Sequence, residues 1–262
     1  DPLSPLVDVV FKTTQPSFMD AWLGCSAYSI QLYFDFAGYS LMAIGLGLML
    51  GFKFEPNFNN PYLAHSIQDF WRRWHLTLSA WLRDYLYIGL LGGNRNSATR
   101  TYLNLLLTMS IGGLWHGGDS WNFLIWGFIH GCALCIARAY HARNYPMNKW
   151  ISRVLTLLVV MFAWTVFRAT DLSSAINVWS GQIGLHDFNV GDQVALALRP
   201  TMFVALFVGI ICIFFPATPS TFWHKTPFAT PAWQAIWPAL AFVFAVIILA
   251  GQQSPPFLYF QF

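Results

Sequence analysis

The chain has 262 residues, of which 56% are hydrophobic, 18% are aromatic and only 10% are charged, with a formal net charge of +3. A soluble domain carries about 25% charged residues, so this composition excludes an ordinary soluble protein and predicts an all-α, polytopic membrane protein. The small charge, together with the lack of a basic run interleaved with aromatic residues, also excludes a nucleic-acid partner.

Hydrophobic segments recur along the chain after a polar, proline-interrupted stretch, 1–20, which predicts a loop ending at Asp20 as a candidate helix cap. A helix that spans a membrane needs about 20 apolar residues. We predict about six hydrophobic helices, near residues 22–50, 101–114, 121–140, 154–167, 202–215 and 233–250. The polar stretch 171–199 predicts another loop. Asp35 interrupts the first segment, either as the cap of a broken helix, as the partner of an arginine, or as a catalytic acid.

Residues 66–117 form the central motif region of what we expect to be a single transmembrane domain over 1–262. Between 66 and 87, apolar residues recur at helical spacing and predict one amphipathic helix whose common face carries Phe70, Trp74, Leu78 and Trp81. It is too charged to span alone, so we expect an interfacial or re-entrant helix packed inside the protein. A glycine-rich turn follows at 92–95.

Lysine and arginine favour the cytoplasmic side of a membrane protein. If the segments 51–100, 138–153 and 216–232 face the cytoplasm, they contain eleven of the 14 basic residues. These are Lys53, Arg72, Arg73, Arg83, Arg95, Arg100, Arg138, Arg143, Lys149, Arg153 and Lys225. The segment before His116 is too short to span fully, so this orientation predicts that His116 lies within the outer half of the membrane.

His116 has the strongest claim to chemistry, because it ends a nearly uncharged segment and the glycines around it leave room for a substrate. A neutral imidazole can take the proton of an alcohol that attacks a carbonyl. The alternative is a polar residue that satisfies a neighbouring helix. His75 is a second candidate whose simpler interpretation is a structural hydrogen bond, and His130 is interpreted as a packing residue.

No motif indicates a covalent nucleophile, a nucleotide or a metal. The chain lacks GxSxG, P-loop, GxGxxG and HExxH patterns. Cys132 and Cys135 match CxxC, but they lie in the middle of a hydrophobic segment with no second ligand pair, so two buried thiols are expected. We therefore expect no bound cofactor and no metal, and direct transfer with a histidine base.

Four ordered motifs resemble the membrane-bound O-acyltransferase superfamily, in particular its alginate O-acetyltransferase type. They are FWRRWH at 70–75, WLRDYLYI at 81–88, GGNR at 92–95 and GLWHG at 113–117, with further similarity at 33–40 and 259–262. The resemblance implies a multi-pass enzyme of the bacterial inner (cytoplasmic) membrane that acetylates hydroxyls of an exported polysaccharide such as alginate. It also implies that the acyl donor is acetyl-CoA or an acyl carrier thioester.

The resemblance implies roles for residues and partners as well. The histidine of the Trp-His-Gly motif, His116, is implied to be catalytic, and His75 is implied to be a second important position. The implied partners are a periplasmic acetyltransferase and the polysaccharide export machinery. Support of a substrate tunnel or of the fold is expected from Arg72, Arg73, Asp84, Trp115 and Asp35, with the first three at the cytoplasmic mouth.

The sequence also departs from the family pattern. Family members are nearly twice as long, so we expect N-terminal spans to be missing. Leu41 stands where an acid is expected, and a shorter turn with proline is expected in place of residues 88–91. The turn carrying Asp119 is one residue longer than the family pattern. These departures affect loops and leave both histidines intact. The alternatives left open are D-alanyl transfer to teichoic acid by the same superfamily, a transporter, and an inactive fragment.

Overall fold

The computed structural model describes residues 1–95, 97–117, 120–143, 146–214 and 236–250. These residues form helices and contain no strand, which confirms the all-α prediction. Residues 1–216 form one compact unit, and α11 (Ile236–Ala250) belongs to a second unit, 217–262, treated by itself. The predicted 216–232 loop, Asp119 and the 259–262 motif lie outside the described residues.

The first unit is built from helices of very different length. In chain order they are α1 (Ser4–Lys12), α2 (Phe18–Met49), the 3₁₀ turn η1 (Pro61–Leu63), α3 (Ile67–Trp71), α4 (Leu76–Trp81), the π-helical η2 (Leu82–Leu90), α5 (Ala98–His116), α6 (Trp121–His141), α7 (Lys149–Arg168), α8 (Leu172–Gln182), α9 (Asp192–Ala197) and α10 (Pro200–Phe214). Within the described residues, each predicted hydrophobic segment falls on a helix, the last of them on α11, and α2, α6 and α7 are long and apolar enough to cross a membrane. The chain is therefore an all-α membrane protein.

Helix α2 is a single helix of 32 residues that begins with a capping box. The Ser17 hydroxyl accepts from the Asp20 N–H at 3.0 Å, and the Asp20 carboxylate accepts from the Ser17 N–H at 3.2 Å. Asp20 also accepts from the Gly191 N–H at 3.1 Å, which ties α9 to this end. Asp20 thus lies inside the first turn and is not the cap that we predicted. Because α2 is continuous at Asp35, that residue does not cap a broken helix.

The predicted loops 1–20 and 171–199 contain helices instead. Helix α1 forms because one of its faces is buried, and Pro5 in its first turn costs no hydrogen bond. Helix α8 begins at Leu172 and is capped by Asp171, whose carboxylate accepts from the Ser174 N–H at 2.8 Å. Tertiary burial therefore outweighs the polar composition that suggested loops. The buried apolar residues of α1 are Leu6, Val7, Val10 and Phe11.

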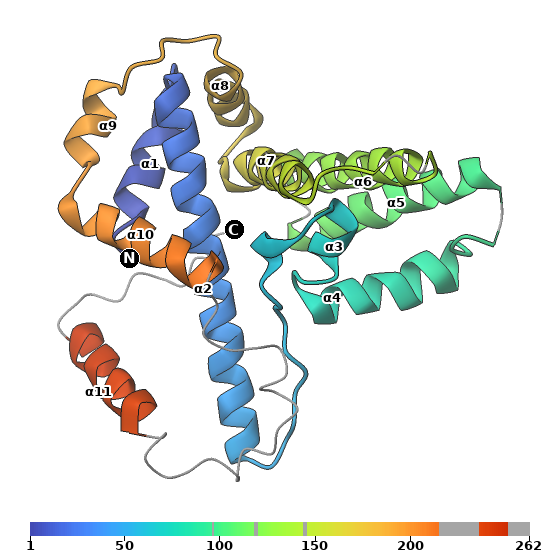
Figure 1. Ribbon diagram of the computed structural model, residues 1–262, viewed down its shortest axis with the longest axis horizontal. Helices are drawn as coiled ribbons and strands as arrows, with labels where there is room; N and C mark the ends of the chain where they lie inside the picture. Colours follow the sequence, from blue (N-terminus) through green and yellow to red (C-terminus); the bar gives the residue numbers. More distant parts are fainter. Residues whose placement is uncertain (96, 118–119, 144–145, 215–235, 251–262) are drawn as a thin grey trace. The chain divides into compact units, whose positions relative to one another are not determined.

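Helices α5 and α6 lie side by side, and α2 runs crosswise to them (Figure 1). Glycines set the close approach of α5 and α6. A Cβ atom at Gly113 would lie 2.2 Å from the carbonyl oxygen of Phe123, and one at Gly127 would lie 2.2 Å from that of Met109. No side chain fits at such distances, so the two backbones are nearly in contact. This packing places the last turn of α5 against the first half of α6.

The segment 66–87 is not the single amphipathic helix that we predicted. His75 has a left-handed backbone, with φ 45° and ψ 57°, and it separates α3 and the turn after it from α4. Phe70 and Trp74 are buried, whereas Trp81 is 54% exposed, so these side chains share no common face. The spacing could not show this break, because a residue with positive φ is uncommon outside glycine.

After the glycine-rich turn that follows η2, α5 runs back alongside η2. Helix η2 packs on α5, and the Asn104 amide of α5 donates to the carbonyl oxygens of Leu91 and Gly93 at 2.8 and 3.0 Å. Gly92 and Gly93 have positive φ values of 82° and 58°, as the predicted glycine-rich turn requires. Only Leu82 and Leu86 of η2 are buried, α4 contains no buried residue, and Tyr85 and Leu90 are exposed, so this segment is not packed inside the protein as we expected. Its depth in a membrane stays a prediction.

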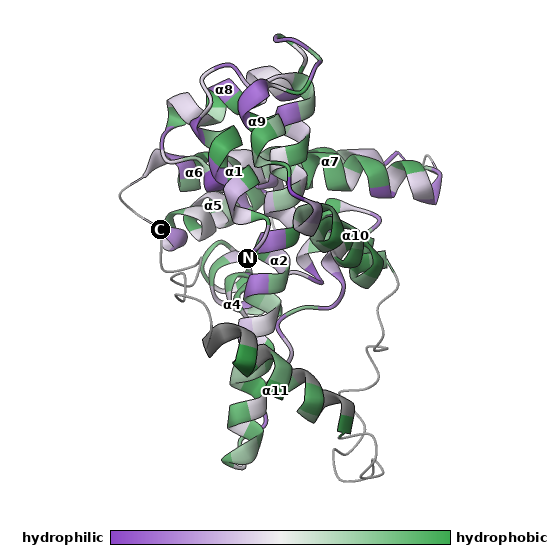
Figure 2. Cartoon of the chain, turned by 90° about the vertical axis from the view of Figure 1, so that its left-hand side faces the viewer, coloured by the Kyte–Doolittle hydropathy of each residue, from purple (hydrophilic) through white to green (hydrophobic). Residues whose placement is uncertain are grey.

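Apolar side chains also cover the outside of the first unit. Figure 2 shows that α10 and most of α7 are hydrophobic. Soluble proteins rarely expose contiguous apolar patches of this kind, and lipid is the environment that such a surface suits. On α10 the exposed apolar residues include Phe203, Val204, Phe207 and Val208.

Candidate functional site

His116 is the last residue of α5, and its half-buried ring lies among aromatic side chains of α6 and α7. Its ring centroid is 5.1 Å from that of Trp126 and 5.3 Å from that of Phe167, with interplanar angles of 89° and 80°. Edge-to-face contacts of this kind are the preferred geometry for aromatic pairs. The aromatic walls therefore restrict how the His116 ring can turn.

His75 lies at the start of α4, and only 9% of it is exposed. Its Nδ1 atom is 3.0 Å from Oδ1 of Asn57, and its ring meets Phe36 of α2 edge to face, with centroids 4.9 Å apart. His75 lies outside the three candidate membrane spans. Burial lowers the pKa of His75 to about 4, so the ring is neutral near pH 7.

The two histidines meet around Trp115. The Trp115 ring centroid lies 5.2 Å from that of His116 and 6.4 Å from that of His75. Segments far apart in the sequence, from the middle of α2, the start of α4 and the end of α5, thus converge on one site. The structure brings together His75, Trp115 and His116 from the predicted site residues, and their catalytic roles stay predictions.

No described interaction joins the charged residues predicted at a tunnel mouth to the side chains of this site or to one another. Arg73 pairs with Asp69 at 2.8 Å, and Asp84 pairs with its neighbour Arg83 at 2.7 Å. Hydrogen bonding from Arg83 lowers the pKa of Asp84. Arg72 is exposed. The structure gives these residues separate surroundings, so their role in binding a donor stays a prediction.

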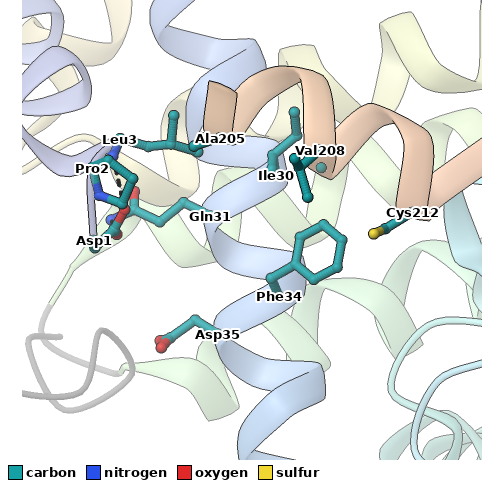
Figure 3. Close-up of a pocket in the computed structure, with 11 residues that line it drawn as sticks. Asp1, Pro2, Leu3, Ile30, Gln31, Phe34, Asp35, Ala205, Val208 and Cys212 are labelled. Atoms are coloured by element: carbon teal, nitrogen blue, oxygen red, sulfur yellow. Dashed lines mark hydrogen bonds between the residues drawn. The ribbon is translucent and has the colours of Figure 1, made fainter. Parts of the chain in front are cut away.

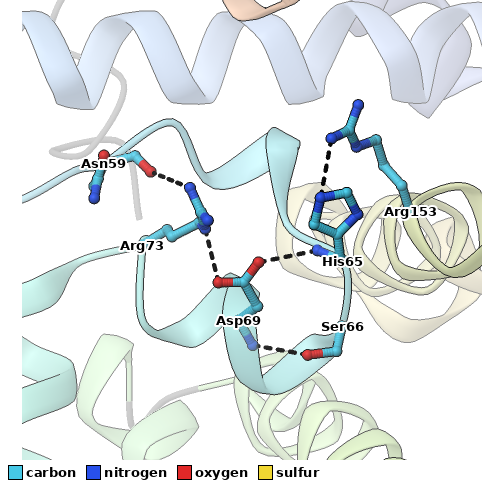
Figure 4. Close-up of polar contacts among 6 residues, drawn as sticks. All are labelled: Asn59, His65, Ser66, Asp69, Arg73 and Arg153. Atoms are coloured by element: carbon cyan, nitrogen blue, oxygen red, sulfur yellow. Dashed lines mark hydrogen bonds and ion pairs between the residues drawn. The ribbon is translucent and has the colours of Figure 1, made fainter. Parts of the chain in front are cut away.

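Arg73 belongs to a network that holds the segment before His75 (Figure 4). The Asp69 carboxylate accepts from the His65 N–H at 3.0 Å, and the Asp69 N–H donates to the Ser66 hydroxyl at 3.0 Å. The Arg153 guanidinium of α7 donates to Nε2 of His65 at 3.2 Å. Burial alone would raise the pKa of Asp69, but the hydrogen bonds from the Arg73 guanidinium and the His65 N–H outweigh burial and lower that pKa. The network fastens α3 to α7.

Asp35 lines a pocket of about 340 Å³ between the residues that precede α1, the middle of α2, and α10 (Figure 3). Gln31 and Phe34 of α2 also line this pocket, and the Gln31 amide donates to the Asp1 carboxylate. No residue of α4 or α5 lines it. Asp35 therefore lines a pocket to which neither His75 nor His116 belongs.

Several neighbours of the histidines were not among the predicted site residues, namely Phe36, Asn57, Trp126 and Phe167. They belong to no charged or histidine motif, so their residue types gave little signal. His130 was expected to be a packing residue and is fully buried. Its ring lies against Trp71 and Trp126, with centroids 5.1 and 5.0 Å away.

Among the residues that the structure describes, no group of three or more histidine, cysteine, aspartate or glutamate side chains could hold a metal ion. Cys132 and Cys135 are free thiols, both half-buried in α6. Neither thiol contacts the histidine site in a described interaction. The absence of a cofactor stays a prediction.

Comparison with known proteins places the chain in a family. Residues 9–175 match the MBOAT, membrane-bound O-acyltransferase family. Over its full length the chain is 42% identical to the protein named "Probable alginate O-acetylase AlgI" of Azotobacter vinelandii, and it covers 58% of that protein. Over 67% of the chain it is 50% identical to a peptidoglycan O-acetyltransferase of Helicobacter pylori, covering 34% of it.

A more distant relative is a teichoic acid D-alanyltransferase of Bacillus subtilis. The two sequences are 31% identical over 53% of this chain, and the match covers 39% of the Bacillus protein. The chain spans a little over half the length of the AlgI-type proteins that it matches along its full length.

Proposed function

Because the chain belongs to the membrane-bound O-acyltransferase family, we propose that it carries the acyl-transfer site of an enzyme that acetylates hydroxyls of an exported polysaccharide such as alginate. The observation that carries this proposal is the meeting of His75 and His116 around one side chain, Trp115. Relatives whose names state O-acetylation of alginate or of peptidoglycan support the acetyl group and the polymer acceptor.

In this proposal His116 is the general base. It takes the proton of the acceptor hydroxyl while the hydroxyl oxygen attacks the thioester carbonyl carbon. A C–O bond forms, the C–S bond breaks, and the proton passes from the imidazolium to the departing thiolate. The aromatic rings of Trp126 and Phe167 cover part of the His116 ring and would limit the access of water, which competes with the acceptor hydroxyl for the acyl group.

The proposed setting is the bacterial inner membrane, crossed several times. Three candidate spans and the concentration of basic residues in 51–100 and 138–153 support this setting, with those segments in the cytoplasm. The thioester donor, acetyl-CoA or an acyl carrier, then arrives from the cytoplasmic side and the polymer from the other side. A periplasmic acetyltransferase and the export machinery are the proposed partners.

The alternatives from the sequence are less well supported. The teichoic acid D-alanyltransferase matches about half of the chain at 31% identity, whereas the Azotobacter relative matches all of it at 42%. A transporter would have no need for two histidines next to one tryptophan in the sequence motifs of an acyltransferase family. An inactive fragment is distinguished only by assay.

The test is the amount of ester-linked acetate on the exported polysaccharide of a host that lacks its own enzyme. The host receives the chain itself, or the chain preceded by the N-terminal part of the Azotobacter relative. It also receives the longer version with His116→Ala or with the matched control His141→Ala, whose residue is exposed at the end of α6. Mass spectrometry of the released acyl group separates acetyl from alanyl transfer.

We expect acetate with the longer version and with the His141→Ala control, and none with His116→Ala. Normal acetylation by the His116→Ala version would exclude His116 as the base. Ester-linked alanine in place of acetate would move the proposal to the D-alanyl branch. No acyl product in any version, with the protein present in the membrane, would overturn the proposed function.

A further inference from the structure

Asn57 lies in the loop between α2 and η1 and forms part of no motif recognised in the sequence. We propose that Asn57 is a positioning residue, which fixes the tautomer of His75 so that His75 presents a hydrogen-bond acceptor to the site that it shares with His116. This inference rests on the proposed acyl-transfer function and adds to it a role for Asn57 and a defined polarity for His75.

The polarity of the Asn57 amide follows from its neighbours. Its Oδ1 atom accepts from the backbone N–H of Thr77 at 3.4 Å and from the Thr77 hydroxyl at 3.0 Å. Its Nδ2 atom donates to the Ser40 hydroxyl of α2 at 3.3 Å. A backbone N–H can only donate, so the amide atom that faces Thr77 is the carbonyl oxygen.

The same oxygen lies 3.0 Å from Nδ1 of His75. An amide oxygen can only accept, so His75 donates to it through an Nδ1–H group. The other ring nitrogen of a neutral imidazole, Nε2, then carries the lone pair. Burial favours the neutral ring, because it lowers the pKa of His75 to about 4. Asn57 therefore selects one of the two neutral tautomers.

Asn57 also holds the backbone next to His75. The Leu76 N–H donates to the Asn57 carbonyl oxygen at 2.9 Å, directly after the residue with the left-handed conformation. A left-handed backbone is unfavourable for a residue with a side chain and persists only where its surroundings fix it. One loop residue thus fixes both the backbone beside His75 and the protonation pattern of its ring.

This tautomer limits what His75 can do in acyl transfer. With Nδ1–H committed to Asn57, the lone pair of Nε2 cannot stabilise an oxyanion, because an oxyanion needs a hydrogen-bond donor. The lone pair can accept a hydrogen bond from a hydroxyl group, which is the group that the acceptor polymer supplies. His75 is thereby suited to hold a second hydroxyl of the acceptor polymer, which orients the polymer while His116 removes the proton of the reacting hydroxyl.

The decisive measurement is the tautomer of His75, by solid-state NMR of the protein in lipid membranes with ¹⁵N-labelled histidine side chains. A His75→Asn variant identifies the signals. We expect a protonated Nδ1 and an unprotonated Nε2. Asn57→Leu removes the acceptor at similar volume and should shift the ring toward the Nε2–H form. Asn57→Asp keeps an acceptor oxygen and should restore Nδ1–H, so a folding defect in Asn57→Leu is recognised.

Asn59→Leu is the matched control, because Asn59 lies in the same loop and bonds to Arg73 through its backbone N–H and carbonyl oxygen. It should leave the His75 signals unchanged. An Nε2–H tautomer in the wild-type protein would overturn the inference. So would an unchanged tautomer in a folded Asn57→Leu variant.

The acetyl-transfer assay adds a functional measurement. Asn57→Leu should lower kcat roughly 10- to 100-fold, the range seen when a residue that orients a functional histidine is removed, with little change in KM. Equal rates for Asn57→Leu and the wild type would overturn the inference while the proposed function stands. If no version transfers acetate, the proposed function fails, and the tautomer measurement still decides whether Asn57 sets the polarity of His75.

Discussion

The rings of His116 and Trp126 meet edge to face, with centroids 5.1 Å apart and planes at 89°. Trp126 is almost fully buried and in turn stacks on Trp164 of α7 at 5.7 Å. The orientation of the proposed base therefore depends on aromatic side chains of two other helices. None of these side chains belongs to the motif that contains His116.

We expect Trp126→Ala to lower the acetyl-transfer rate about tenfold or more, because His116 loses a wall of its pocket. The variant should also lose about 3–5 kcal/mol of stability, the usual cost of truncating a buried tryptophan. Trp126→Phe should retain most of the rate. The control is Trp121→Ala on the same helix, whose side chain is 74% exposed. A wild-type rate for Trp126→Ala would show that this wall is dispensable.

The close approach of α5 and α6 predicts a large cost for any side chain at Gly127. We expect Gly127→Ala to destabilise the protein by about 3 kcal/mol, because the new Cβ would meet the backbone of Met109. The matched control is Gly45→Ala in α2, where a Cβ meets no atom within 4 Å. That change should be neutral or stabilise by up to about 1 kcal/mol through helix propensity. Thermal unfolding in detergent compares the two, and equal midpoints would contradict the packing argument.

Asp69 predicts a pH-dependent contribution to stability. Its pKa is lowered in the folded protein from the ordinary value of 3.8, since the hydrogen bonds from Arg73 and the His65 N–H outweigh the effect of burial. A lowered carboxyl pKa stabilises the folded state above the ordinary value, and the contribution is lost as the pH falls through the lowered pKa. The stability difference between the wild type and Asp69→Asn should therefore shrink below pH 3.8. A difference that stays constant down to lower pH would exclude this account.

His75 predicts a second pH dependence, in a different window. Burial lowers its pKa from 6.5 to about 4, so the unfolded chain binds a proton at this position more readily than the folded protein. The stability that this neutral histidine provides is complete above pH 6.5 and is lost as the pH falls toward 4. His75→Asn suits the test because asparagine tolerates a left-handed backbone. Its unfolding midpoint should fall less than that of the wild type across this window, and parallel curves would show that His75 is not buried as described.

The hydrophobic helices could be predicted from the sequence because the signal that defines them is local. Helix α6 was predicted at 121–140 and is observed at Trp121–His141. Helix α7 was predicted at 154–167 and is observed at Lys149–Arg168, with an earlier start that Asn148 caps. Helices α1 and α8 were predicted as loops, because burial against α2 decides their structure and polar composition hides it.

The candidate site shows the same division. His75 and His116 could be named from their motifs, and family resemblance rather than spacing connected them. Both histidines contact Trp115 because α5 runs back alongside η2. No local sequence pattern encodes this packing of two helices. Asn57 could not have been found, because its role requires the loop before η1 to fold back beside Thr77.

The left-handed residue between α3 and α4 has a consequence for how the chain tolerates insertions and deletions. In one continuous helix, each added residue rotates everything beyond it by about 100°. Because His75 interrupts the helical path, an insertion in η2 leaves the rotational setting of α3 and of its contacts with α7 untouched. Length variation such as that expected at 88–91 can therefore accumulate after the imidazole without turning it away from its partners.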